Sequence, residues 1–218
     1  FFMASKLSKS DLKRIAEELE EYASGYGGFI NYLRGETDAI EEEDLEEDLP
    51  WKPVFFLMAG AGRLKVYKRI LKDHSYELDE YTGASVNSAI EDAYEYVLEN
   101  KKEIKKQVGE AFEYLLDAYQ EGYVSTNNQS LGWSFDDFLE ERDLIEFFLL
   151  GVEEQFPVVD YAVEVFEEDC KVRERINELG LENYADEYFP GRLHWYPKRF
   201  WWHHRPEERT PHPDGLES

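Results

Sequence analysis

The stretch that decides the fold is Pro53-Val-Phe-Phe-Leu-Met-Ala-Gly-Ala-Gly-Arg-Leu-Lys-Val-Tyr-Lys-Arg-Ile-Leu-Lys-Asp73. From Val54 to Ala61 almost every residue is apolar, as expected for an element that is buried on all sides. After Gly62 apolar residues recur at helical spacing with basic residues between them: Leu64, Tyr67, Ile70 and Leu71. Proline suits the first turn of a helix. The stretch predicts one helix whose first half crosses the core, where Gly60 and Gly62 let a neighbouring helix come close.

A different interpretation of the same stretch is a buried strand over residues 54–59 that leads into a phosphate-binding turn at Gly60-Ala-Gly62. A dinucleotide-binding fingerprint requires a third glycine at position 65, which is a lysine here. No second strand and helix unit follows, although a parallel sheet requires several. We therefore favour the helix.

The composition predicts a globular domain with a strongly acidic surface. Of 218 residues, 42% are hydrophobic and 16% aromatic, enough for a substantial core. The 49 acidic residues outnumber the 24 basic ones and give a net charge of −25. Such a charge repels nucleic acids and anionic membranes and attracts basic partners, so we expect no direct nucleic-acid binding by the acidic body. Solubility or adaptation to high salt is the alternative explanation, although lysine is not depleted.

The remaining bulk features predict a cytoplasmic protein. Cys170 is the single cysteine, which excludes an internal disulfide framework. Because it falls within a predicted helix, we expect it to be a small buried hydrophobe. No apolar run is long enough to cross a bilayer. Residues 1–6 lack the basic and apolar segments of a signal peptide.

Helical periodicity extends along most of the chain, and no long alternating strand pattern occurs. We expect helices over residues 11–23, 53–73, 85–99, 100–122, 135–150 and 158–179, with a separate short piece at 29–34 after the Gly25-Tyr-Gly-Gly28 break. Ser10 is expected to cap the first helix, and Asn100 with Glu103 resembles a capping box. Gly180 is expected to cap the C-terminus of the last helix. The predicted fold is all-α, an irregular bundle of about six to eight helices.

The C-terminal tail differs in composition from the rest. Residues 191–218 contain three of the five tryptophans, four of the five histidines and several prolines, which argue against a helix. We therefore divide the chain into an acidic helical domain, residues 1–190, and an extended aromatic and basic C-terminal arm, residues 191–218.

No catalytic, cofactor-binding or metal-binding constellation emerges from the sequence. The Glu-x-x-His motif of helical di-iron sites is absent, because no histidine has a glutamate three positions before it. We favour the absence of a metal site. The alternative is a transition-metal site built from the histidines of the tail: His194, His203, His204 and His212. The acidic segment after residue 35 lacks the alternating ligands and central glycine of an EF-hand. We therefore predict no cofactor.

Two segments are candidate partner-binding regions. The first is the most acidic stretch of the chain: Glu36, Asp38, Glu41, Glu42, Glu43, Asp44, Glu46, Glu47 and Asp48. The second lies in the arm: Trp195, Tyr196, Arg199, Phe200, Trp201 and Trp202. Tryptophan, tyrosine and arginine dominate binding hot spots, so the arm either docks on another subunit or packs on the protein's own helices. Stacking on single-stranded nucleic acid is disfavoured by the acidic body.

Three functional hypotheses follow. The leading one is a non-enzymatic acidic protein that engages a basic protein surface, as a DNA-mimic-type inhibitor or an adaptor. The second is a structural subunit of a larger assembly that docks through residues 191–218. The third is a helical enzyme whose site the sequence does not reveal.

Overall fold

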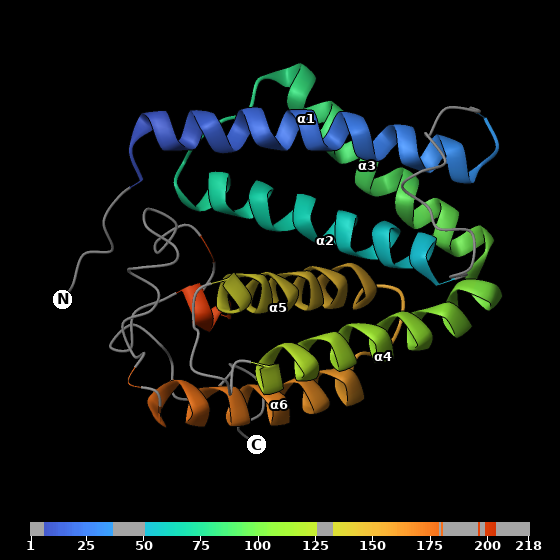
Figure 1. Ribbon diagram of the computed structural model, residues 1–218. Helices are drawn as coiled ribbons and strands as arrows, with labels where there is room; N and C mark the ends of the chain where they lie inside the picture. Colours follow the sequence, from blue (N-terminus) through green and yellow to red (C-terminus); the bar gives the residue numbers. More distant parts are fainter. Residues whose placement is uncertain are drawn as a thin grey trace.

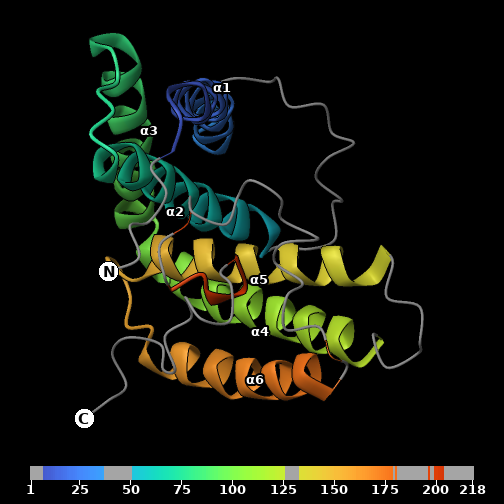
Figure 2. The ribbon, with the colours of Figure 1, turned by 90° about the vertical axis from the view of Figure 1, so that its left-hand side faces the viewer.

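The fold is all-α, as the sequence predicts. The computed structural model describes residues 7–36, 51–125, 133–178, 180, 196 and 199–203. Within these residues there are six α-helices and no strand: α1 (Lys9–Leu33), α2 (Lys52–Asp73), α3 (Glu80–Glu99), α4 (Lys101–Ser125), α5 (Trp133–Val152) and α6 (Val159–Glu178). Figures 1 and 2 show α1 and α3 on one side of α2, and α5, α4 and α6 on the other.

Helix α2 is the centre of the bundle. It forms contacts with α1, α3, α4 and α5, and its residues from Leu57 to Gly62 are all buried. Pro53 lies in its first turn, as expected. The prediction of one continuous helix is confirmed, and the strand with a phosphate-binding turn is excluded because backbone hydrogen bonds run through Gly60 and Gly62 as a helix.

Glycines bring α2 and α5 into backbone contact. A Cβ atom on Gly62 would overlap the carbonyl group of Phe147, and one on Gly151 would overlap the carbonyl group of Met58. Gly60 allows α1 to approach α2 closely, because a Cβ atom at Gly60 would overlap the ring of Tyr26 in α1. The prediction that Gly60 and Gly62 permit close approach is confirmed. The sequence predicts the end of this helix at residue 150, but Gly151 lies inside α5, where it supplies the matching half of this contact.

Helix α1 is a single helix, so the predicted break at Gly25 to Gly28 is wrong. A glycine within a helix costs only about 0.5–1 kcal/mol relative to alanine. That cost is offset here because Tyr26 and Ile30 continue the buried stripe begun by Leu12. The Tyr26 hydroxyl donates to the carbonyl of Leu57 in α2. The cap is also shifted, since Ser8 rather than Ser10 accepts from the backbone N–H of Asp11 in a capping box.

The junctions on either side of α3 also differ from expectation. Helix α3 begins at Glu80 rather than 85, because the Asp79 carboxylate accepts from the backbone N–H of Thr82 at 3.0 Å and caps it. Asn100 and Glu103 do not form a capping box. The side chain of Asn100 instead donates to the carbonyl of Tyr96, and Glu103 accepts from Gln107.

The last helix ends where the sequence predicts, but its cysteine is placed differently. Gly180 adopts a φ of +68°, the left-handed conformation typical of the residue after a helix, and its N–H donates to the carbonyl of Asn177. Cys170 is exposed rather than buried, because the buried face of α6 is formed by Val165, Val172 and Ile176. None of the helices in the described part of the chain combines the length and the apolar character needed to cross a membrane.

Candidate functional site

A cluster of buried charges joins α5, α6 and the short 3₁₀ turn η2 (Trp201–His203). Its centre is Asp169, which is 5% exposed. The Asp169 carboxylate accepts from Arg142 Nε at 2.9 Å and Nη2 at 3.1 Å, from the Tyr119 hydroxyl at 2.9 Å and from Trp201 Nε1 at 3.0 Å. Four donors on three elements therefore converge on one carboxylate, which fixes η2 to α6.

Two further carboxylates on α5 complete the cluster. Glu146 accepts from Arg142 Nη1 at 2.9 Å and forms an ion pair with Arg199. Asp143 Oδ1 lies 2.7 Å from Trp202 Nε1 and 2.6 Å from His203 Nε2.

The carboxylates of the cluster stabilise the buried charge of Arg142. Burial disfavours the charged Arg142 guanidinium, but the negative charges of Asp169 and Glu146 outweigh that effect and raise the pKa of Arg142 above its usual value. The same guanidinium lies 4.2 Å from the centre of the Trp202 ring, a cation–π contact. Each carboxylate is held by donors of the protein itself. The arrangement is therefore suited to fixing η2 in place rather than to binding a substrate.

The structure places the described aromatic residues of the predicted arm in the protein's own core. Tyr196, Phe200, Trp201 and Trp202 are all buried, and Phe200 contacts the ring of Phe147 in α5. Arg199 is more exposed but pairs with Glu146. In the acidic segment, Glu36 is exposed just after α1. The predicted residues from Asp38 to Asp48, together with Trp195, lie outside the described residues, so their partner-binding role stays a prediction.

Helices α4 and α6 lie side by side and run in the same direction (Figure 1). Near the start of α6, the Tyr161 ring stacks on Phe112 with 4.3 Å between ring centroids. About two turns further along both helices, Tyr119 donates to Asp169. This parallel register aligns the second half of α4 with the first half of α6.

Acidic residues recur on both helices, and the two sets meet at Tyr161, which Glu113 of α4 and Glu164 and Asp160 of α6 all influence. On α4, four carboxylates recur at spacings of three and four, and no basic residue occurs from 107 to 121: Glu110, Glu113, Asp117 and Glu121. On α6, three carboxylates recur at the same spacing: Asp160, Glu164 and Glu167. Residues at these spacings share one face of a helix. We refer to these seven residues as the α4–α6 acidic face.

Three residues of the α4–α6 acidic face act on the hydroxyl of Tyr161. Burial first, and then the negative charges of Glu113, Glu164 and Asp160, raise the pKa of Tyr161 above its usual value. Among the ion pairs of the described residues, one includes a residue of this face: Lys106 and Glu110 lie 3.6 Å apart. Two apolar side chains of α6 are also exposed, Val159 at 66% and Val163 at 37%. The face thus combines like charges with exposed apolar contact area.

Sequence reasoning missed this face, although its signal is present in the sequence. The regular spacing on α4 and the basic-free run from 107 to 121 are visible in the printed chain. The chain contains so many carboxylates, however, that the pattern stands out only when the two helices are known to be neighbours.

The described residues contain no group of three or more histidine, cysteine, aspartate or glutamate side chains placed to hold a metal ion. No protein-family model, no curated protein and no solved structure matches the chain.

Proposed function

We propose that the protein is a non-enzymatic binding protein whose α4–α6 acidic face engages a basic surface of another protein. One observation carries the proposal: α4 and α6 pack in parallel at Phe112 and Tyr161, and acids of both helices, Glu113, Glu164 and Asp160, surround Tyr161. Neighbouring carboxylates of a stripe, about 5–6 Å apart, lie within the Debye length of roughly 8–10 Å at physiological salt, so their fields add. A partner with clustered lysines or arginines would be steered to this face.

The type of partner follows from the chemistry of the face. Carboxylates in a regular row resemble the phosphates of a nucleic acid, so a protein that normally binds nucleic acid is one class of partner. An adaptor for another basic protein is the second class. The exposed Val159 and Val163 supply apolar contact that a nucleic acid lacks, which would favour a partner with apolar residues among its basic ones.

The experiment is co-purification from the native host with a face variant and a matched control. The face variant carries Glu113→Gln, Asp117→Asn, Glu164→Gln and Glu167→Gln. The control carries the same number of neutral substitutions on exposed glutamates of α1 and α3: Glu20→Gln, Glu21→Gln, Glu91→Gln and Glu99→Gln. We expect the wild type and the control to retain a basic partner at low salt, and the face variant to lose it. Retention by the face variant, or wild-type binding that does not weaken as salt rises, contradicts the proposal.

The assembly-subunit hypothesis remains the second candidate, and one structural observation weighs against it. Docking through residues 191–218 requires aromatic side chains that can reach a neighbour. Phe200, Trp201 and Trp202 are instead at most 3% exposed within the chain itself. A docking role of the arm would therefore depend on its residues outside the described part.

A further inference from the structure

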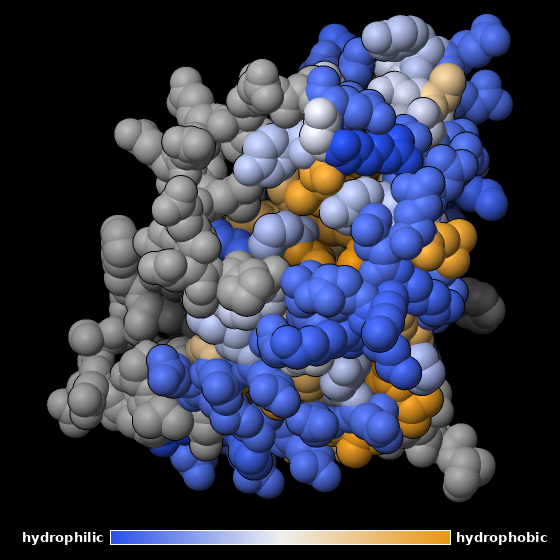
Figure 3. Space-filling view, turned by 90° about the vertical axis from the view of Figure 1, so that its right-hand side faces the viewer, coloured by the Kyte–Doolittle hydropathy of each residue, from blue (hydrophilic) through white to orange (hydrophobic). Residues whose placement is uncertain are grey.

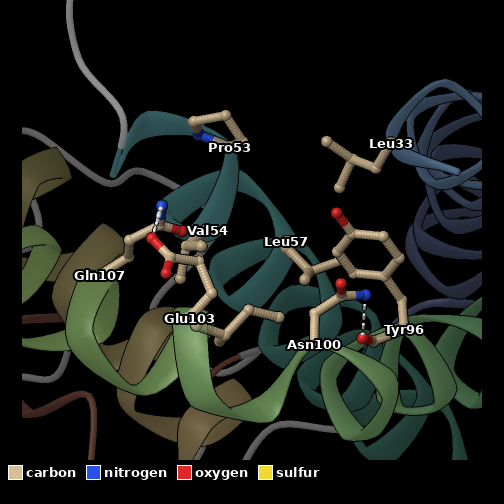
Figure 4. A pocket seen from close by; sticks show the side chains of 9 residues that line it. Leu33, Pro53, Val54, Leu57, Tyr96, Asn100, Glu103 and Gln107 are labelled. Carbon is tan, nitrogen blue, oxygen red and sulfur yellow. Dashed lines mark hydrogen bonds between the residues drawn. The ribbon is translucent and has the colours of Figure 1, made fainter. Parts of the chain in front are cut away.

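A pocket of about 230 Å³ opens where the ends of four helices meet. Leu33 ends α1, Pro53 and Val54 begin α2, Tyr96 lies in the last turn of α3, and Glu103 lies in the first turn of α4 (Figure 4). Figure 3 faces this end of the molecule and shows apolar surface between hydrophilic side chains. The pocket lies outside the buried charge cluster and has no role so far.

The pocket has an apolar floor and polar groups at both ends. Val54 and Leu57 of α2 form the middle of the floor (Figure 4). At one end the Glu103 carboxylate accepts from Gln107 Nε2 at 3.2 Å. At the other end are the Tyr96 hydroxyl and Asn100, whose side-chain nitrogen donates to the Tyr96 carbonyl at 3.0 Å and leaves its oxygen as an acceptor.

The residues that line the pocket favour an occupant with a positive charge. Among the described residues that line the pocket, Glu103 is the one with a charge, and none is a lysine or an arginine. Burial raises the pKa of Tyr96 above its usual value, so its hydroxyl stays neutral at physiological pH. An occupant with an apolar stem and one positive end therefore complements the pocket better than an acid or a fully apolar molecule.

We infer that this pocket receives a lysine side chain of the basic partner. The four-carbon stem of lysine lies over Val54 and Leu57, and its ammonium group donates to the Glu103 carboxylate. Asn100 lies at the other end of the pocket from Glu103 (Figure 4), so the peptide group of the same lysine can reach Asn100. This inference rests on the proposed function, because it assumes a basic protein as the partner.

The pocket and the α4–α6 acidic face can be reached by one partner. Both lie on α4, and Glu103 precedes Glu110 by seven residues, about 10 Å along the helix axis. The pocket would then anchor one lysine of the partner, whereas the face would attract its remaining positive charge. Anchor residues that fill a pocket contribute most to the affinity of an interface.

The test uses the full-length chain and two blocked tripeptides, acetyl-Gly-Lys-Gly-amide and its norleucine analogue, which keeps the stem without the ammonium group. Chemical shifts of the ¹⁵N-labelled protein are followed at low salt. We expect the lysine peptide to perturb amides around Leu33, Val54 and Ile104 and to bind about fivefold more tightly than the norleucine peptide. The substitution Glu103→Gln should abolish that difference, and Glu99→Gln, which removes a nearby exposed carboxylate outside the pocket, should preserve it.

Equal binding of the two peptides, equal effects of Glu103→Gln and Glu99→Gln, or shifts that fall outside the pocket would each overturn the inference. These outcomes are independent of the co-purification experiment. If the face variant loses its partner but the peptides do not distinguish the pocket, the proposed function stands and the lysine pocket fails. A thermal melt of each variant confirms that it is folded.

Discussion

Gly62 of α2 lies against the backbone carbonyl of Phe147 in α5, with no space for a side chain between them. The contact is reciprocal, because Gly151 of α5 lies in the same way against the carbonyl of Met58. Two helices thus approach at the backbone level over one stretch of each, in the middle of the core.

This relationship predicts opposite effects of one substitution at two glycines. Gly62→Ala forces a methyl group into the Phe147 carbonyl, and we expect it to destabilise the protein by about 3 kcal/mol or more. Gly28→Ala in α1 meets no atom within 4 Å, so it should stabilise the protein by about 0.5–1 kcal/mol. Urea unfolding of both variants measures the difference. A neutral Gly62→Ala variant would show that the helices separate easily.

Asp169 should be among the most sensitive residues of the chain. Asp169→Asn places a donor opposite the donors of Arg142, Tyr119 and Trp201 and leaves the buried guanidinium without its main counter-charge. We expect a loss of about 3–5 kcal/mol. The control is Glu178→Gln, which breaks an exposed ion pair with Arg175 and should change stability by less than about 1 kcal/mol. Similar losses for both variants in urea unfolding would argue against a special role of the cluster.

Truncation distinguishes a segment that belongs to the core from a free arm. A chain that ends at residue 195 loses the buried side chains of Phe200, Trp201 and Trp202. Removal of a single buried aromatic side chain costs about 3–5 kcal/mol, so we expect this chain to be largely unfolded or molten. A chain that ends at residue 203 keeps these contacts and should remain folded. Circular dichroism and near-ultraviolet spectra report the outcome. A folded chain ending at 195 would restore the free-arm interpretation.

The protein should lose stability in alkaline solution. Burial raises the pKa of Tyr26 well above its usual value of 10.0, and Tyr22 and Tyr94 shift in the same direction. Above pH 10 the unfolded chain releases phenolic protons that the folded chain retains, so the free energy of unfolding falls as the pH rises. One fully protected tyrosine accounts for about 1.4 kcal/mol at pH 11.

The variant Tyr26→Phe provides the matched control for this pH effect. It removes one of the protected phenols together with its hydrogen bond to Leu57, so it should be less stable at pH 8. Between pH 8 and pH 11, however, it should lose less stability than the wild type. Urea unfolding at each pH, with tyrosinate absorbance as a second signal, checks both parts. Parallel pH profiles would contradict the assignment to Tyr26.

The sequence predicts those features that depend on local pattern. Helix α2 is recognisable because its apolar run and its glycines occur within one segment, and the close approach at Gly62 follows from the same residues. The continuity of α1 through Gly25 to Gly28 is not recognisable, because it depends on the burial of Tyr26 against another helix. The start of α3 is missed because Tyr81, Thr82 and Gly83 are weak helix formers, and the cap at Asp79 compensates for them.

The candidate sites depend on contacts between distant residues. Arg142 and Asp169 are 27 residues apart, and Asp143 and His203 are 60 apart. Charged residues at such positions resemble surface residues in a periodicity pattern, so nothing local marks them as buried. The α4–α6 acidic face is partly readable, since each stripe has helical spacing, but the parallel register that joins the stripes is a tertiary property.

The burial of Trp201 and Trp202 also sets the order in which a nascent chain matures. A ribosome finishes all six helices before these tryptophans are translated, and at that moment Asp143 and Asp169 still lack their indole donors. The surface of α5 that later covers Phe200 is then open to water. Folding is therefore completed only once residue 203 has emerged from the ribosome. A chain that stalls or is cleaved before that point exposes an aggregation-prone apolar surface, which chaperones and proteases recognise.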